Sequence, residues 1–185
     1  MCGIFKMKFS KKISVDDRGV KKIAAKLSEP IIMRNVRIVE IDDMDVHLDV
    51  SKSKTDTLSS VDDLIVDKAK RSKMAWFGKD LNDLTIQSAF RASNQHNIVR
   101  VRRCPDTRLF DENNQEITDF PEVGDPVSVA IDLAYIELLK SSIETSYNLV
   151  QLRKVRRAST KKVVPSSMFE DDEIQSDDDE EEFEE

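Results

Sequence analysis

The sequence predicts a mainly β protein with one or two helices, in which five strands close into a small barrel followed by a disordered acidic tail. Three observations lead to this prediction. Several segments alternate apolar and polar residues with period two, which is typical of strands with one buried face. Short turn-like sequences separate these segments. The last 16 residues contain twelve carboxylates and no cation, and their mutual repulsion disfavours any packed structure.

The N-terminal third is expected to contain a short strand or ordered arm, then a helix, then a hairpin. The first nine residues mostly alternate apolar and basic side chains. Residues 20–27 place four apolar side chains on one helical face, and Asp16 and Asp17 precede them as caps. Residues 31–41 are β-branched and alternating, and residues 44–50 return as the hairpin partner after a turn.

The central third is expected to contain one clear helix and one clear strand. Apolar residues at helical spacing predict a helix from Ser60 to Gly78, with basic later turns. Residues 84–91 fit a strand, and they also fit a helix that begins at Asp80. We favour the strand, because the polar segment that follows then joins it to residues 98–103. In that segment valines face one way and arginines the other.

The remaining strands are predicted from the same alternation. Residues 107–110 end at a polar turn, and Ile117 begins the return. Residues 127–139 form a long strand, with the odd-numbered side chains from Val127 to Tyr135 on one face. Residues 147–157 form the last strand and lead into a basic stretch. Strands joined by short turns, with one intervening helix, indicate a small closed barrel.

Charge is unevenly distributed along the chain. All 29 Lys and Arg residues precede position 170, together with 24 of the 36 acidic residues, so residues 1–169 carry about +5. The two Cys and two His show no metal-ligand spacing, and we expect no metal or cofactor. Without a signal peptide or an apolar run of about 20 residues, the chain is expected to be soluble, away from membranes, and cytoplasmic, in the host cytoplasm if it is viral.

The stretch from Arg108 to Asp132 carries a resemblance to a known family. It reads RLFDENNQEITDFPEVGDPVSVAID: a strand ending in Asp, a polar turn, a D-x-P, and a V-G-x-x before an alternating strand. With a later strand at 149–155, this resembles a segment of the bacteriophage single-stranded DNA-binding proteins, which are built on an OB-fold. An acidic tail with an aromatic residue near its end is also shared by many replicative single-stranded DNA-binding proteins.

The resemblance implies an OB-fold-like nucleic-acid-binding domain at residues 1–163 and a disordered acidic tail at 164–185. It implies a non-enzymatic protein that binds single-stranded DNA during replication, recombination or repair. A homodimer is compatible with this function. The tail would recruit replication proteins, such as a polymerase, helicase or primase, and compete with DNA for the groove. Such tails commonly end on Phe, whereas here Glu184 and Glu185 follow Phe183, so its use as a docking residue stays open.

Binding single strands without sequence preference requires cations along the backbone and aromatic faces on which bases stack. The DNA-binding residues expected on this basis are Trp76, Phe77, Lys79, Arg91, Arg100, Arg102, Arg103, Arg108, Tyr147, Arg153, Arg156 and Arg157. The tail residues expected to bind partners are Asp177, Asp178, Asp179, Glu180, Glu181, Glu182 and Phe183. Further aromatic residues, Phe90, Phe110 and Tyr135, fit the core better than an exposed platform.

Two alternatives belong to other classes. An acidic-tailed chaperone or adaptor would bind basic proteins through the tail, and the arginines would only be solvated. An RNA-binding OB-fold protein is the other alternative, because nothing in the sequence reads a 2′-hydroxyl. Enzymes are disfavoured, since the chain has only four glycines, no glycine-rich phosphate loop and no His paired with a nucleophile.

Overall fold

Five strands form a ring through their hydrogen-bonded pairings in the computed structural model, which describes residues 6–53 and 55–156. They are β3 (Ile31–Ile41), β4 (Asp45–Asp49), β5 (Ile98–Phe110), β7 (Pro126–Leu138) and β8 (Ile143–Lys154). β3 pairs with β4 and β7, and β4 pairs with β5. β8 closes the ring, running parallel to β5 and antiparallel to β7. The predicted mainly β, five-stranded OB-like barrel is confirmed.

Alternation of buried apolar and exposed polar side chains explains why these segments form strands with one face in the core. On β5, Val99 and Val101 are buried while Arg100 and Arg102 are exposed, as the sequence predicted. β3 and β4 likewise turn one apolar face inward, and their hairpin is also as predicted. A short strand, β6 (Glu116–Ile117), returns along the end of β5 outside the ring.

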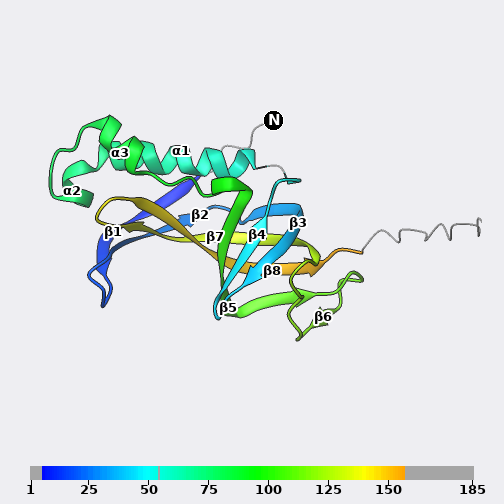
Figure 1. Cartoon of the computed structure of the whole chain (residues 1–185). Coiled ribbons are helices and arrows are strands. Elements are labelled where there is room, and N and C mark those ends of the chain that lie inside the picture. Colours follow the sequence, from blue (N-terminus) through cyan, green and yellow to red (C-terminus); the bar gives the residue numbers. More distant parts are fainter. Residues whose placement is uncertain (1–5, 54, 157–185) are drawn as a thin grey trace, which may run out of the picture.

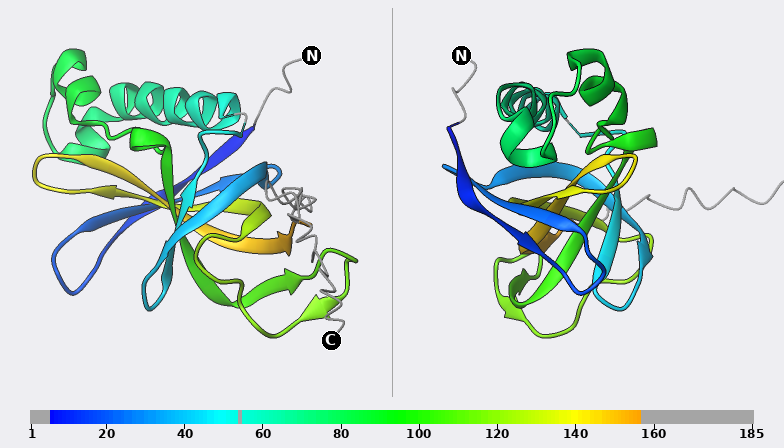
Figure 2. Two further views of the ribbon diagram at one scale, coloured as in Figure 1. Left: turned by 45° about the vertical axis from the view of Figure 1, so that its right-hand side comes forward. Right: turned by 90° about the vertical axis from the view of Figure 1, so that its left-hand side faces the viewer.

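A hairpin of two further strands extends the sheet beside β7. β1 (Met7–Val15) pairs with β2 (Lys21–Leu27), and β2 pairs with the second half of β7. We call this hairpin the N-terminal arm. Figure 2 shows the arm and the β7–β8 hairpin extending beyond the ring, on the side opposite β6.

The arm corrects the predicted helix at residues 20–27. Ile23, Ala25 and Leu27 are buried at period two, and the side chains between them are exposed, which is a strand pattern. The predicted cap, Asp16, instead closes the β1–β2 turn by accepting hydrogen bonds from the backbone N–H of Arg18 and Val20.

Three helices lie between β4 and β5 in the sequence and cover one side of the sheet, at the top of Figure 1. α1 (Asp56–Arg71) is followed by α2 (Lys73–Phe77) and α3 (Asp83–Ala89). α1 buries four apolar residues spaced three and four apart, namely Leu58, Val61, Ile65 and Ala69. The predicted helix from Ser60 to Gly78 therefore begins earlier and is interrupted at Ser72, and Gly78 ends it at φ 71°.

α3 replaces the strand predicted at residues 84–91. The Asn82 side chain accepts a hydrogen bond from Thr85 N–H at 3.0 Å and so starts a helix. Leu84, which the strand interpretation places on an apolar face, is 77% exposed, whereas Ile86 is buried. The spacing of the apolar residues fits both a strand and a helix at residues 84–91, and the Asn82 cap decides for the helix.

A β-bulge corrects the predicted facing of Tyr135. Val127, Val129, Ile131 and Leu133 point inward as expected, but the β7–β8 register shifts between Leu133 and Tyr135. The next buried residue is Ile136, so Tyr135 turns to the outer face.

None of the helices that the structure describes is long and apolar enough to cross a membrane.

Candidate functional site

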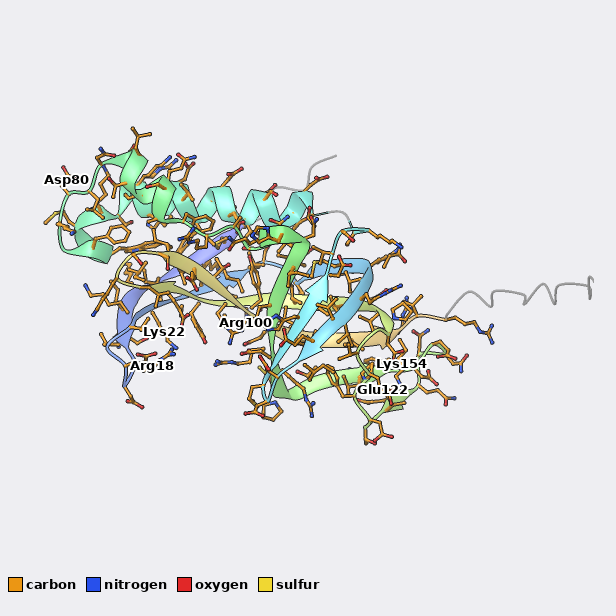
Figure 3. The ribbon with its side chains drawn as sticks, in the orientation of Figure 1. Arg18, Lys22, Asp80, Arg100, Glu122 and Lys154 are labelled. Atoms are coloured by element: carbon orange, nitrogen blue, oxygen red, sulfur yellow. The ribbon has the colours of Figure 1, made fainter. Side chains whose placement is uncertain are left out.

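A groove of about 680 Å³ lies where the outer faces of β4 and β5 meet the β7–β8 hairpin. The tip of the N-terminal arm and the segment between α3 and β5 complete its walls. Figure 3 shows Arg18 and Lys22 on the arm and Arg100 on β5, on the side of the sheet turned away from the helices. Charged and polar side chains dominate the lining: Arg18, Asp45, His47, Arg91, Ser93, Gln95, His96, Arg100, Arg102, Tyr135, Glu137, Glu144, Thr145, Ser146 and Tyr147.

Two arginines on β5 share one carboxylate on β4. Asp45 lies opposite Arg102, and His47 lies opposite Arg100, so all four side chains share the outer face. The Arg100 guanidinium donates to Asp45 Oδ2 through Nε at 3.1 Å and through Nη2, which raises the pKa of Arg100 further. Arg102 Nε lies 3.9 Å from the other oxygen of Asp45. Asp45 therefore fixes the Arg100 guanidinium by hydrogen bonds, whereas Arg102 lies at the limit of ion-pair distance and keeps most of its donors available.

The opposite wall carries a second set of ion pairs. Lys22 Nζ lies 3.1 Å from Glu137 and 3.3 Å from Asp16, and Arg18 contacts the same two carboxylates. A hydrogen bond from the Val20 backbone N–H, with further donors from Arg18 and Lys22, lowers the pKa of Asp16 to about 2. Counting four arginines against three carboxylates, the groove itself carries about one positive charge.

Tyr135 supplies the aromatic surface of the groove. The bulge in β7 turns its ring outward, where it is partly exposed. The Lys22 ammonium group lies 4.5 Å from the ring centroid, a cation–π arrangement that positions the ring against the arm. An aromatic face beside arginines is the combination that stacking of unpaired bases requires.

A buried hydrogen-bond network supports the wall formed by residues 91–96. Asp62 of α1 accepts hydrogen bonds from the backbone N–H of Ser93, at 2.9 Å, and from the Ser93 hydroxyl. The same hydroxyl contacts Thr145 Oγ1 at 2.9 Å and the Tyr147 hydroxyl at 3.0 Å. Burial raises the pKa of Asp62 to about 6, against the Ser93 hydrogen bonds that lower it, and burial also raises the pKa of Tyr147.

The predicted DNA-binding residues divide among three places. Arg91, Arg100, Arg102 and Tyr147 line the groove. Tyr147 is only 2% exposed and its hydroxyl is engaged, so its edge contributes to the floor but no ring face is presented to a base.

The predicted aromatic pair on α2 lies in the helical layer. Trp76 is 4% exposed and packs against Phe9 at 6.0 Å and Phe77 at 6.4 Å, between ring centroids. A stacking role for Trp76 would require its removal from the core. Lys79 is exposed in the turn after Gly78, and neither it nor Phe77 lines the groove.

The other predicted arginines gather at the β5–β6 end of the barrel. The guanidinium carbon of Arg103 lies 4.8 Å from the Phe120 ring centroid, and that of Arg108 lies 5.1 Å from Phe110. Arg108 also pairs with Glu116 at 3.2 Å. Arg153 donates to Asn114 Oδ1 and lines a smaller hollow of about 190 Å³ with Arg156. Arg157 and the tail residues Asp177–Phe183 lie outside the described residues.

Sequence reasoning did not identify Arg18, Asp45 or the Asp62–Ser93 pair as parts of the site. Nothing local in the sequence distinguishes these residues from solvated ones, because distant pairings bring them to the groove. For Tyr135 the sequence does contain a signal. If Ile136 is a core residue, the period-two pattern that runs to Leu133 must shift by one residue, and Tyr135 then faces outward. No group of three His, Cys, Asp or Glu side chains in residues 6–53 and 55–156 is arranged to hold a metal ion.

Comparisons with known proteins identify one matching family and several distantly similar structures. A family model described as "Family of unknown function (DUF5871)" matches residues 34–171. No curated protein matches the sequence. The single-stranded DNA-binding protein of bacteriophage Enc34, in a C-terminally truncated form, is similar with 14% identity and a TM-score of 0.41, over 82% of this chain and 96% of that chain.

Two further structures of the Enc34 protein show the same level of similarity. The one in complex with single-stranded DNA has 14% identity and a TM-score of 0.38, over 81% of this chain and 93% of that chain. The other has 13% identity and a TM-score of 0.38, over 85% and 96%. These scores are too low to carry an argument, so the functional inference below rests on the groove itself.

The buried position of Asp62 predicts a stability that depends on pH. The raised pKa means that the folded protein binds this proton more tightly than the unfolded chain, whose aspartate pKa is near 3.8. Lowering the pH from 7 to 5 should therefore increase the free energy of unfolding by about 1 kcal/mol through this group. Chemical denaturation at the two pH values measures the difference.

Two variants isolate the contribution of Asp62. Asp62→Asn should not show this increase in the free energy of unfolding between pH 7 and pH 5. Asp63→Asn, which changes an exposed neighbour on the same helix, should still show it. Identical pH dependence in the wild type and Asp62→Asn would show that the buried carboxyl does not bind the proton in this range.

Proposed function

The chain belongs to DUF5871, a family of unknown function, and we propose that it binds single-stranded DNA in the groove between β4–β5 and the β7–β8 hairpin. The protein acts by binding rather than by catalysis. In this proposal DNA phosphates contact arginines on the groove walls, and bases contact the aromatic ring between them. Replication, recombination or repair of DNA is the setting in which such a protein acts.

One observation carries the proposal: four arginines and a partly exposed tyrosine ring line a single groove. Arg18 lies on the arm, Arg91 before β5, and Arg100 and Arg102 on β5 itself. Tyr135 lies between these walls. Cations that follow the backbone, together with aromatic faces that stack on bases, are the two requirements for binding single strands without sequence preference.

The position of the groove on the barrel supports the same function. β4 and β5 are the second and third strands of the five-stranded ring in chain order. In OB-folds the face of strands 2 and 3, with the adjoining loops, is the surface that binds oligonucleotides and oligosaccharides. The turn between β7 and β8 corresponds to the loop between strands 4 and 5, and residues at the start of β8 line the groove.

Single strands are favoured over duplex because of the tyrosine. The bases of a duplex are stacked on one another, so only its charged backbone is accessible to Tyr135 and the arginines. An unpaired base adds a stacking contact worth about 1–3 kcal/mol. Asp45 contributes indirectly, because it fixes the guanidinium group of Arg100 before DNA arrives.

The acidic tail is proposed to regulate this groove and to recruit partners. Residues 170–185 carry twelve carboxylates on the same chain as the arginines, so their effective concentration near the groove reaches the millimolar range. They would occupy the groove part of the time and yield to DNA. Replication proteins such as a polymerase, helicase or primase would bind the tail once DNA displaces it.

The first test of this function is selectivity. Full-length protein titrated into labelled oligo-dT should bind more tightly than into duplex of equal length and label. Tyr135→Ala should weaken binding to oligo-dT by about 1–3 kcal/mol, whereas Tyr135→Phe should keep most of the affinity. Neither change should alter duplex binding by a comparable amount. Fluorescence anisotropy at constant salt measures all of these affinities.

Equal affinity of the wild type for oligo-dT and duplex would overturn the proposed function. Equal losses for Tyr135→Ala and Tyr135→Phe would place the effect in the hydroxyl rather than in the ring face. A loss on both single strand and duplex would indicate that the substitution acts through the fold.

A second test concerns the tail. Removing residues 170–185 should tighten binding to oligo-dT severalfold at low salt, because a competing polyanion is removed. The difference should fade near 0.5 M salt, where the Debye length falls to about 4–5 Å. Phe183→Ala in the full chain is the matched control, and it should leave affinity almost unchanged. Unaltered binding after truncation, measured at low salt, would exclude competition by the tail.

A further inference from the structure

The positive charge of the chain is concentrated in the N-terminal arm. Residues 30–169 contain 21 Lys and Arg and 21 Asp and Glu, so they are neutral at pH 7. Residues 1–29 contain eight cations and three carboxylates. The whole excess of about +5 that precedes the tail therefore lies in these 29 residues, most of them in β1, β2 and their turn.

Most of the cations in the arm have no ion-pair partner in the part of the chain that the structure describes. Arg18 and Lys22 share Asp16 and Glu137. Within residues 6–53 and 55–156, no carboxylate lies within ion-pair distance of the six other lysines of the arm, all of which are exposed: Lys6, Lys8, Lys11, Lys12, Lys21 and Lys26. This surface is therefore ready to bind an anion without first breaking an ion pair.

Two of these lysines lie directly opposite each other. Lys8 on β1 is the Cα partner of Lys26 on β2, so both side chains project from the same face of the hairpin. Like charges at such positions repel each other, and no acidic residue on the neighbouring positions relieves this pair. A bound phosphate between the two ammonium groups would relieve it.

The register connects this face of the arm with the groove. Lys22 lies opposite Glu137, and Ala24 lies opposite Tyr135, and both β7 residues line the groove. Side chains two residues apart on a strand share a face, so Lys22, Ala24 and Lys26 continue the surface on which Tyr135 and Glu137 lie. The tip of the arm also reaches the groove, since Arg18 lines it.

We propose that the outer face of the N-terminal arm, marked by Lys8 and Lys26, binds the phosphate backbone of the same single strand as it leaves the groove. This inference rests on the proposed function and extends its site. The groove, with about one net positive charge, supplies base stacking and fixed arginines. The arm supplies the sequence-independent attraction for phosphate.

The geometry sets the length of DNA for which the arm matters. Lys26 lies four residues beyond Lys22 on β2, or about 13 Å at roughly 3.3 Å per residue. At about 3.4 Å or more per nucleotide, this distance corresponds to no more than about four nucleotides. The arm should therefore contribute little to the shortest oligo-dT that the protein binds, and increasingly as the oligonucleotide lengthens.

The experiment compares salt dependence between matched double variants. Lys8→Gln with Lys26→Gln removes the opposed pair, and Lys52→Gln with Lys79→Gln removes two exposed lysines, from the β4–α1 turn and from the turn after α2. For long oligo-dT, losing two phosphate contacts should reduce the log–log salt slope by about 1.4, so the affinity loss should be tens of times larger at 0.05 M than at 1 M salt. The control pair should leave the slope unchanged, and Lys8→Arg with Lys26→Arg should retain it.

The outcomes separate this inference from the proposed function. A wild type that does not prefer oligo-dT over duplex would overturn the proposed function and this extension with it. If that preference holds but Lys8→Gln with Lys26→Gln keeps the wild-type slope, only the role of the arm is overturned. An equal change in the control pair would also overturn it, because the effect would then come from net charge. Thermal unfolding of each variant confirms that the comparison is made on folded protein.

Discussion

Closure of the barrel depends on β8, which forms hydrogen bonds along both of its edges. Tyr147 is the Cα partner of Val101 on β5 and of Leu133 on β7, so it lies at the point where the two halves of the ring meet. Burial on the core side is complete there, with Leu149 and Leu152 almost inaccessible. Without β8, the buried edges of β5 and β7 would lose their backbone partners, which costs free energy at each unpaired group. The groove depends on the same strand, because β8 joins the β5 wall to the β7–β8 hairpin.

The helical layer is tied to the ring through a polar contact as well as through apolar packing. Asp62 of α1 holds Ser93 by two hydrogen bonds, and Ser93 in turn contacts the hydroxyl groups of Thr145 and Tyr147 on β8. The segment before β5 is thereby fixed between a helix and a strand. A buried carboxylate is costly by itself, and here its hydrogen bonds offset part of that cost. The consequence is a groove wall that is fixed at Ser93 by contacts to both α1 and β8.

Much of the barrel could be predicted from the sequence, because period-two alternation at β3, β5 and β7 directly reflects one buried face. Predictions failed where a local cap, a bulge or a long-range strand pairing overrode the apolar pattern. Residues 20–27 fit a helix as well as a strand by apolar spacing, and pairing with β7 decides for the strand. The Asn82 cap decides for a helix at α3, and the bulge at Tyr135 reverses one side chain. The site was harder to predict, since Arg18, Asp45 and Tyr135 are brought together only by long-range pairings.

The distribution of charge gives the proposed site a division of labour. In the groove, Arg18, Arg100 and Arg102 lie within ion-pair distance of a carboxylate, so their attraction for phosphate is weakened while their positions are better defined. On the arm, lysines with no ion-pair partner among residues 6–53 and 55–156 provide attraction but no fixed geometry, because exposed lysine side chains are long and flexible. Attraction of this kind is screened within about 10 Å at 0.1 M salt, so it acts on nearby phosphates only. In the proposed site, strength from the arm and orientation from the groove are therefore separable, and the twelve carboxylates proposed to compete with DNA would act through charge alone.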